Sequence, residues 1–331
     1  MIGITATVPV EIIFAAGLRP VDLNNLFITH ENPNSLVSQA EAAGFSYNTC
    51  AWIKGIYSTV INNGINEVIA VTGGDCSNTI ALGEVLGRMG VKVLSFEYPL
   101  NRNRKALRLQ MDKLRKELGT TWDDIEKTKG LLDRIRAKLR RLDRLSWQEN
   151  VVTGLENNLF LVSSSDFGGD PEKFEHDVDK FLSVAGKREP AKNEIRLGYL
   201  GVPPILSRFY EHIESLGARV VFNEVQRQFS MPFDHKDIVD QYLEYTYPYD
   251  MDGRLSDIKK AVEERQLDGL IHYTQMFCYR QIYDIIIRNE LSIPVLTLEG
   301  DRPGQIDGRT ALRIETFVEM LKDRKRKSRN A

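Results

Sequence analysis

The stretch that decides the fold is residues 66–86, NEVIAVTGGDCSNTIALGEVL. An apolar run from Val68 to Val71 stops at two glycines, and an amphipathic segment begins a few residues later. This order of strand, glycine turn and helix is typical of a strand–helix–strand unit whose strands run parallel. Cys76, one of only three cysteines in the chain, lies between the predicted strand and the predicted helix.

The same alternation extends in both directions from this stretch. Before it, PVEIIFAAG (9–17) predicts a helix with proline in its first turn and glycine at its end. The other predicted strands are IGITATV (2–8), RPVDL (19–23), VKVLSFEYP (91–99), IRLGYLGVP (195–203), ARVVFNEV (218–225), DGLIHYTQ (268–275) and IPVLTLEGD (293–301). We therefore expect an α/β protein with two Rossmann-like domains, each a doubly wound parallel sheet.

The predicted domains are residues 1–190 and 191–331, because the polar link VAGKREPAKNE (184–194) separates the two series of strands. Residues 101–149 interrupt the first series with a highly charged segment. Its leucine, isoleucine and methionine residues recur at three- and four-residue steps, which predicts a long helical hairpin or arm. Two interpretations stay open: an arm with a solvated outer face, and a lid or partner-docking arm over a site.

The bulk composition excludes several classes of partner. The formal net charge is −2, and no apolar run reaches the roughly 20 residues of a membrane helix. We expect no nucleic-acid partner and no membrane partner, and we interpret the basic run KDRKRKSRN (322–330) as a solvated helix end. The start MIGITATVPVEIIF lacks the features of a signal peptide, so we expect a cytoplasmic protein.

The three cysteines, Cys50, Cys76 and Cys278, each lie at the start of a predicted helix. Cys76 and Cys278 also follow strands, at the sheet edge where open α/β sheets place ligands. Helix N-termini lower the pKa of a thiol and favour the metal-binding thiolate. Three interpretations stay open: unrelated buried cysteines, a Cys₃ zinc site, and an iron–sulfur cluster, whose ligands are often far apart in sequence.

Three motifs decide between these interpretations. LEGDRPGQIDGRTALRIETFVEML (298–321) resembles the C-terminal signature of the 2-hydroxyacyl-CoA dehydratase D-component family, which includes benzoyl-CoA reductase subunits. PVEIIFAAGLRPV (9–21) resembles that family's N-terminal element, and HYTQMFCYRQIYDIII (272–287) resembles the region of its third cysteine. The resemblance spans nearly the whole chain in the expected order.

The resemblance implies that Cys50, Cys76 and Cys278 ligate a [4Fe–4S] cluster between two Rossmann-like halves. It also implies a lyase or oxidoreductase subunit that works as a dimer, with a copy of itself or with a paralogous subunit. A separate ATP-dependent iron–sulfur activator protein would deliver single electrons. An acyl-CoA thioester would then be reduced to a ketyl radical anion and lose its hydroxyl group, in a site that is sensitive to oxygen.

Other residues of the matched motifs are candidates for roles at the site. Glu11 is a candidate acid, base or substrate contact, or else a first-turn glutamate that stabilises its helix. His272 is a candidate proton donor, although its strand position favours a core histidine. Gln275 is a candidate hydrogen-bond donor to the cluster or substrate. Asp75 is interpreted as a helix cap.

Glu299 and Asp301 belong to the C-terminal signature, and the sequence assigns them no role. Two alternative functions stay open beside the dehydratase interpretation. One is a reductase of small molecules that carries a double-cubane cluster, which needs more cysteines than one chain supplies. The other is a non-catalytic cluster-binding partner or maturation protein.

Overall fold

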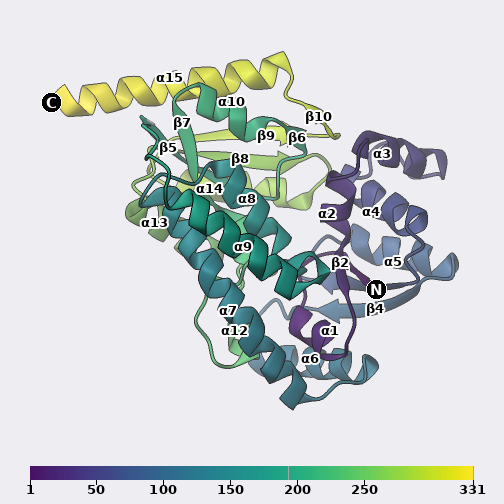
Figure 1. Ribbon diagram of the computed structural model, residues 1–331. Coiled ribbons are helices and arrows are strands. Elements are labelled where there is room, and N and C mark those ends of the chain that lie inside the picture. Colours follow the sequence, from purple (N-terminus) through teal and green to yellow (C-terminus); the bar gives the residue numbers. More distant parts are fainter. Residues whose placement is uncertain (193, 331) are drawn as a thin grey trace.

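The computed structural model describes residues 1–192 and 194–330, and in this part of the chain two four-stranded parallel sheets form the framework (Figure 1). The strands of the first sheet lie in the order β2-β1-β3-β4, and those of the second in the order β7-β5-β8-β9. The first sheet consists of β1 (Ile2–Ile4), β2 (Pro20–Asp22), β3 (Glu67–Gly73) and β4 (Lys92–Glu97). The second consists of β5 (Ile195–Leu200), β7 (Ala218–Asn223), β8 (Gly269–Gln275) and β9 (Val295–Gly300). In both sheets the four strands lie in the order second, first, third, fourth, counted along the chain. The predicted pair of doubly wound units is therefore confirmed.

Helices connect the strands and cover the sheets (Figure 1). Those before the link are α1 (Val10–Ala15), α2 (Leu23–Ile28), α3 (Pro33–Ala42), α4 (Ala51–Asn62), α5 (Asn78–Arg88), α6 (Arg104–Glu117), α7 (Trp122–Trp147), α8 (Gly154–Ser163), η1 (Phe167–Gly169) and α9 (Pro171–Ala185). Those after it are α10 (Phe209–Ser215), α11 (Glu224–Phe229), α12 (Ile238–Glu244), α13 (Met251–Glu264), η2 (Tyr279–Tyr283), α14 (Asp284–Glu290) and α15 (Gly308–Asn330). Two short strands, β6 (Leu206–Ser207) and β10 (Gly304–Gln305), pair with each other beside the second sheet.

The charged segment forms the hairpin of α6 and α7, but this hairpin is part of the protein core. The helix α7 begins after Thr121, whose hydroxyl accepts the backbone N–H of Asp124. Its buried apolar residues recur at helical spacing and belong to the same core cluster as β1 and α1: Ile125, Leu132, Ile135, Leu139, Leu142 and Leu145. Because α7 packs against α1, α8 and α9, its apolar face has no room to act as a lid.

The C-terminal end of α7 is fastened to the second half of the chain. Asp143 accepts hydrogen bonds from both terminal nitrogens of Arg265, at 3.1 and 2.6 Å, and both side chains are buried. Arg196 of β5 donates to the backbone carbonyl of Trp147 at 2.8 Å. Helix α7 therefore contacts both halves of the chain: it packs against α1, and its C-terminal end is hydrogen-bonded to β5 of the second sheet.

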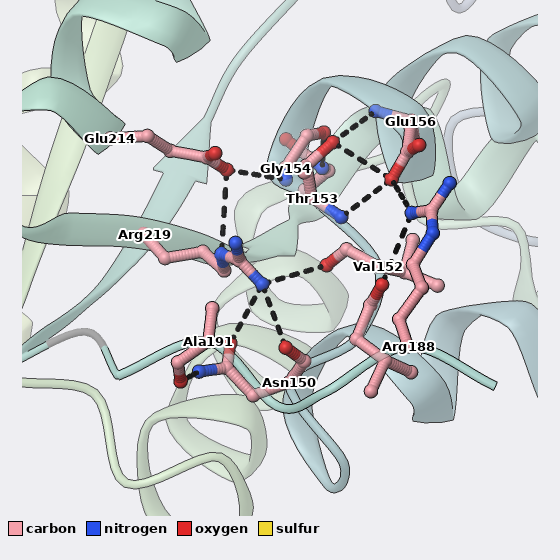
Figure 2. Close-up of polar contacts among 11 residues, drawn as sticks. Asn150, Val152, Thr153, Gly154, Glu156, Arg188, Ala191, Glu214 and Arg219 are labelled. Atoms are coloured by element: carbon pink, nitrogen blue, oxygen red, sulfur yellow. Dashed lines mark hydrogen bonds and ion pairs between the residues drawn. The ribbon is translucent and has the colours of Figure 1, made fainter. Parts of the chain in front are cut away.

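Figure 2 shows a second junction, where the chain passes from the first sheet to the second. Nη1 of Arg219, in β7, donates to the backbone carbonyls of Asn150 at 3.0 Å and Val152 at 3.4 Å. Nη1 of Arg188, in the predicted link, donates to Glu156 at 2.8 Å. Residue 193 of this link lies outside the described residues. The bonds of Arg219 hold the loop between α7 and α8 against the second sheet, and the bond of Arg188 holds the link against the first turn of α8.

Residues 231–249 come after β5 and β7 in the chain, but they pack against the first half of the protein. Met231, Ile238, Tyr242 and Tyr245 are buried in the core cluster that contains β1, α1 and α7. The two halves are thus in contact through α12 as well as through α7. No helix in the described part of the chain is both long and apolar enough to cross a membrane.

Candidate functional site

The candidate site lies where the strand order of both sheets reverses. In the first sheet the chain continues from β1 to β2 on one side and from β3 to β4 on the other, and in the second sheet it continues from β5 to β7 and from β8 to β9 in the same way. A crevice at the carboxyl ends of such strands is the usual ligand site of an open α/β sheet. A cavity of about 700 Å³ occupies this place, and residues that end or follow these four strands line it: Thr5, Thr7, Asp75, Cys76, Val202, Gln275 and Cys278.

All three cysteines of the chain line this one cavity. Cys50 is the residue that precedes α4, Cys76 lies two residues before α5, and Cys278 precedes η2. The predicted positions at helix starts are therefore confirmed, although the helix after Cys278 opens as a 3₁₀ turn before α14. Residues that are 228 positions apart, from Cys50 to Cys278, share one wall because the two sheets face the same cavity.

Tight turns bring Cys76 and Cys278 to the cavity. Gly74 has φ +87°, and a Cβ atom built on it would lie 2.7 Å from the backbone oxygen of Pro248. Only glycine fits at this position, which explains the glycine pair that ends the strand in the stretch 66–86. Phe277, immediately before Cys278, also has a left-handed backbone, with φ 63°. Both strands thus end in a left-handed turn within two residues of a cysteine.

Burial controls the ionisation of the thiols. It raises the pKa of Cys50 to about 12 and the pKa of Cys76 to about 11, and it raises the pKa of Cys278 as well. Backbone N–H groups at the helix starts, such as that of Trp52 near Cys50, act in the opposite direction but are weaker than burial. Burial therefore outweighs the helix N-termini, which were expected to favour thiolates, in setting the pKa values of these thiols.

The three cysteines are the candidate metal ligands of this cavity. Among the described residues, no three His, Cys, Asp or Glu side chains are grouped tightly enough to hold one metal ion. A four-iron cluster is much larger than one ion, and its cysteine ligands stand correspondingly further apart. Cys50, Cys76 and Cys278 share a cavity wall and each has a backbone N–H group nearby to donate to its sulfur. These residues could hold such a group, because N–H donors stabilise the thiolates that a metal requires.

A buried arginine lies beside two of the cysteines. Arg280 is 8% exposed, and its Nη2 donates to the backbone oxygen of Gly74 at 2.9 Å, so it joins the turn before Cys76 to the turn after Cys278. Its guanidinium carbon lies 4.2 Å from the ring centre of Tyr247. Nη1 has no hydrogen-bond partner among the described residues. This positive charge lowers the pKa of both neighbouring thiols, against the larger effect of burial.

The structure places Glu11 in the core and not in the cavity. Its carboxylate forms an ion pair with Arg136 at 2.8 Å and accepts hydrogen bonds from Tyr242 at 2.8 Å and Gln241 at 3.1 Å. Glu11 is 0% exposed and Arg136 is 2% exposed. These contacts join α1, α7 and α12, which gives Glu11 a structural role.

His272 and Gln275 lie on the same strand but face different surroundings. His272 is buried, its Nδ1 lies 2.7 Å from a carboxylate oxygen of Asp284, and burial lowers its pKa. It does not line the main cavity, in agreement with a core histidine. Gln275 does line the cavity beside Cys278, and its amide donates to the backbone oxygen of Asp301 at 2.7 Å while its oxygen accepts from Tyr273 at 3.0 Å.

The remaining sequence candidates are spread around the site. Asp75 lines the cavity and accepts a hydrogen bond from Tyr247 at 3.4 Å, and burial raises its pKa. It does not cap α5, which begins after Ser77 without a side-chain cap. Asp301 accepts a bond from Tyr47 at 3.4 Å, and Glu299 is exposed at the end of β9.

Two polar groups near the cysteines were not predicted from the sequence, Arg280 and Asp22. Burial raises the pKa of Asp22, a cavity-lining carboxyl that accepts a hydrogen bond from Ser165. Arg280 was detectable from its position two residues after Cys278. Asp22 carried no such signal, because Ser165 reaches it from the turn after α8, 143 residues away in the chain.

A comparison with protein families decides the lineage of the chain. The model of the family described as 2-hydroxyglutaryl-CoA dehydratase, D-component, matches residues 5–321. The chain belongs to this family. The D-component family is named for one component of a multi-component dehydratase, so its members are relatives of an enzyme subunit. No curated protein matches the chain.

Proposed function

We propose that this D-component relative is the iron–sulfur subunit of a radical 2-hydroxyacyl-CoA dehydratase-like or benzoyl-CoA reductase-like enzyme of the cytoplasm. The observation that carries the proposal is that Cys50, Cys76 and Cys278 line one cavity at the switch points of both sheets. Bound there, a [4Fe–4S] cluster would supply the single electrons that convert a CoA thioester to its ketyl radical anion. A separate ATP-dependent activator protein would provide those electrons, and a second copy of the chain or a paralogous subunit would complete the enzyme.

The chain's own residues have distinct tasks in this proposal. Arg280 balances the negative charge of the thiolates, since it is fixed by Gly74 and Tyr247 within reach of two of them. Gln275 fixes the end of β8, just before Cys278, by donating a hydrogen bond to the backbone oxygen of Asp301. The carboxyl group of Asp22 holds a proton at higher pH than an exposed aspartate, because burial disfavours its charged form.

The test is anaerobic purification of the full chain, followed by iron and sulfide assays and EPR spectroscopy. We expect about four iron and four sulfide per chain. In the variant Cys76→Ala the iron content should fall sharply, whereas the neighbouring control Ser77→Ala should retain it, because Ser77 is exposed and does not line the cavity.

Two results would change the proposal. A carefully anaerobic preparation without iron overturns it. Iron well above four per chain, lost in the same variant, favours the double-cubane type of reductase over the dehydratase.

A further inference from the structure

Part of the mouth of the cavity lies between the two halves of the chain. Residues 31–34, at the start of α3, line it on one side, and residues 303–305, which follow β9, line it on the other. Most of these residues are exposed. Helix α3 and strand β10 lie next to each other here (Figure 1). A side chain that bonds one of these segments to the other therefore closes this part of the entrance to the cysteines.

Arg302 makes this connection with all three of its side-chain nitrogens. Its Nη1 donates to Oε1 of Glu41 at 2.7 Å. Its Nε donates to Oδ1 of Asn34 at 3.0 Å, and its Nη2 donates to Oγ of Ser38 at 3.1 Å. The three acceptors are spaced four and three residues apart in α3, so they lie on one face of the helix. One residue of the second half thus holds α3 at three points.

The contacts of Arg302 continue to the helix that carries Cys50. Oε1 of Glu41 also accepts a hydrogen bond from Nζ of Lys54 at 2.8 Å. The backbone N–H of Lys54 donates to the carbonyl oxygen of Cys50 at 3.2 Å, in the first turn of α4. Glu41 therefore joins Arg302 to the segment that places Cys50 at the cavity.

The bonds of Arg302 can break without leaving a buried charge. Arg302 is 25% exposed and Glu41 is 24% exposed, and Asn34 and Ser38 are exposed as well, so water replaces the lost bonds. Lys54 is only 2% exposed, but it keeps Glu41 as its partner when Arg302 leaves. Ion pairs that are open to water in this way add little to stability. The state without these bonds is therefore close in free energy to the state with them.

Other contacts keep the two halves together when the bonds of Arg302 break. Asp143 and Arg265 form a buried ion pair, and separating them would leave charges without partners in the interior. Phe27 and Ile205, from different halves, belong to one buried apolar cluster. We therefore expect a local opening at the mouth and not a separation of the halves.

We propose that Arg302 is a clasp over the mouth of the cavity, and that its release opens the cavity and uncovers Cys50. In the closed state the clasp shields the three cysteines from solvent. In the open state a ligand enters between α3 and the segment after β9. The inference goes beyond the proposed function, because it concerns access to the cavity and not the group that is bound in it.

Thiol labelling measures this opening directly, because all three cysteines of the chain line the cavity. The full chain is reduced, freed of metal with a chelator and treated with N-ethylmaleimide, and mass spectrometry follows the modification of each cysteine. Cys50 is 6% exposed and is the most buried of the three, so its labelling depends most on the opening. In the variant Arg302→Gln we expect Cys50 to be labelled about five- to tenfold faster, since the open state gains population when the ion pair is lost.

Two further variants serve as controls. Arg302→Lys keeps a positive charge for Glu41 but cannot hold the two other acceptors at the same time, so its labelling rate should be intermediate. Arg134→Gln removes an exposed ion pair with Glu175, and neither of these residues lines the cavity, so the rate should stay unchanged. Circular dichroism verifies that each variant is folded before it is labelled.

Salt provides a second measurement that needs no variant. About 0.5 M NaCl screens an exposed ion pair, so Cys50 of the unaltered chain should be labelled faster, whereas the rate in Arg302→Gln should not respond. Equal rates in the unaltered chain and in a folded Arg302→Gln variant overturn the inference, and so does a rate in the unaltered chain that salt does not change. Neither iron nor a thioester takes part in this test, so its failure leaves the proposed function standing.

Discussion

The replacement Glu11→Ala separates a structural role of this residue from a catalytic one. In the folded protein Glu11 neutralises Arg136, and both side chains are almost completely buried. The remaining acidic partner of Arg136 is Asp133, which is partly exposed and lies 3.0 Å away. Removing one member of a buried ion pair leaves an uncompensated charge, so the free energy of unfolding should fall by about 3–5 kcal/mol.

Urea denaturation followed by circular dichroism measures this change. The double variant Glu11→Leu with Arg136→Met should recover most of the lost stability, because it removes both charges and fills the same space with apolar atoms. The control Asp177→Ala breaks an exposed ion pair with Lys173, four residues away in α9, and should change stability little.

The structural reasoning also predicts what should not change. At temperatures where the variant Glu11→Ala is folded, its iron content and its affinity for acyl-CoA should equal those of the unaltered chain, since Glu11 does not line the cavity. A fully stable Glu11→Ala variant would refute the reasoning from the buried pair. A stable variant that has lost acyl-CoA binding would return Glu11 to the list of active-site residues.

Two further predictions concern buried charges beside the cavity. Burial raises the pKa of Asp166 to about 6, so the folded state holds this proton more tightly than the unfolded state. The stability of the unaltered chain relative to Asp166→Asn should therefore fall by about 2 kcal/mol as the pH rises from about 4 to 6. A rise in this relative stability over that range, measured by urea denaturation, would contradict the assignment. The variant Arg280→Gln should lower the midpoint potential of the proposed cluster by tens of millivolts, roughly what the loss of a nearby positive charge implies, whereas Arg280→Lys should preserve it. An unchanged potential in an iron-loaded Arg280→Gln protein would show that this charge does not act on the cluster.

Much of the framework followed directly from the sequence. The strand predicted around the apolar run from Val68 to Val71 coincides with β3. Hydrophobic periodicity and glycine stops were also enough to place Cys50, Cys76 and Cys278 at the starts of helices. These features are local: backbone propensity, alternation and turn chemistry act over a few residues, so a single sequence contains them. The division into domains at residue 190 stays a prediction.

Tertiary structure decided which side chains meet and how each is ionised. The segment 101–149 indicated either a helical hairpin with a solvated outer face or a lid, and tertiary contacts decided between them: the apolar face of α7 is buried against α1 and α9, because its apolar residues find partners far away in the chain. Helix N-termini indicated thiolates, but burial in a shared cavity raises the pKa of all three thiols. The position of Glu11 after the first strand suggested the cleft, yet Arg136 and Tyr242, more than a hundred residues away, bind it in the core. Desolvation and pairing depend on atoms brought together by the whole fold, and for that reason the sequence by itself located the cysteines but not their environment.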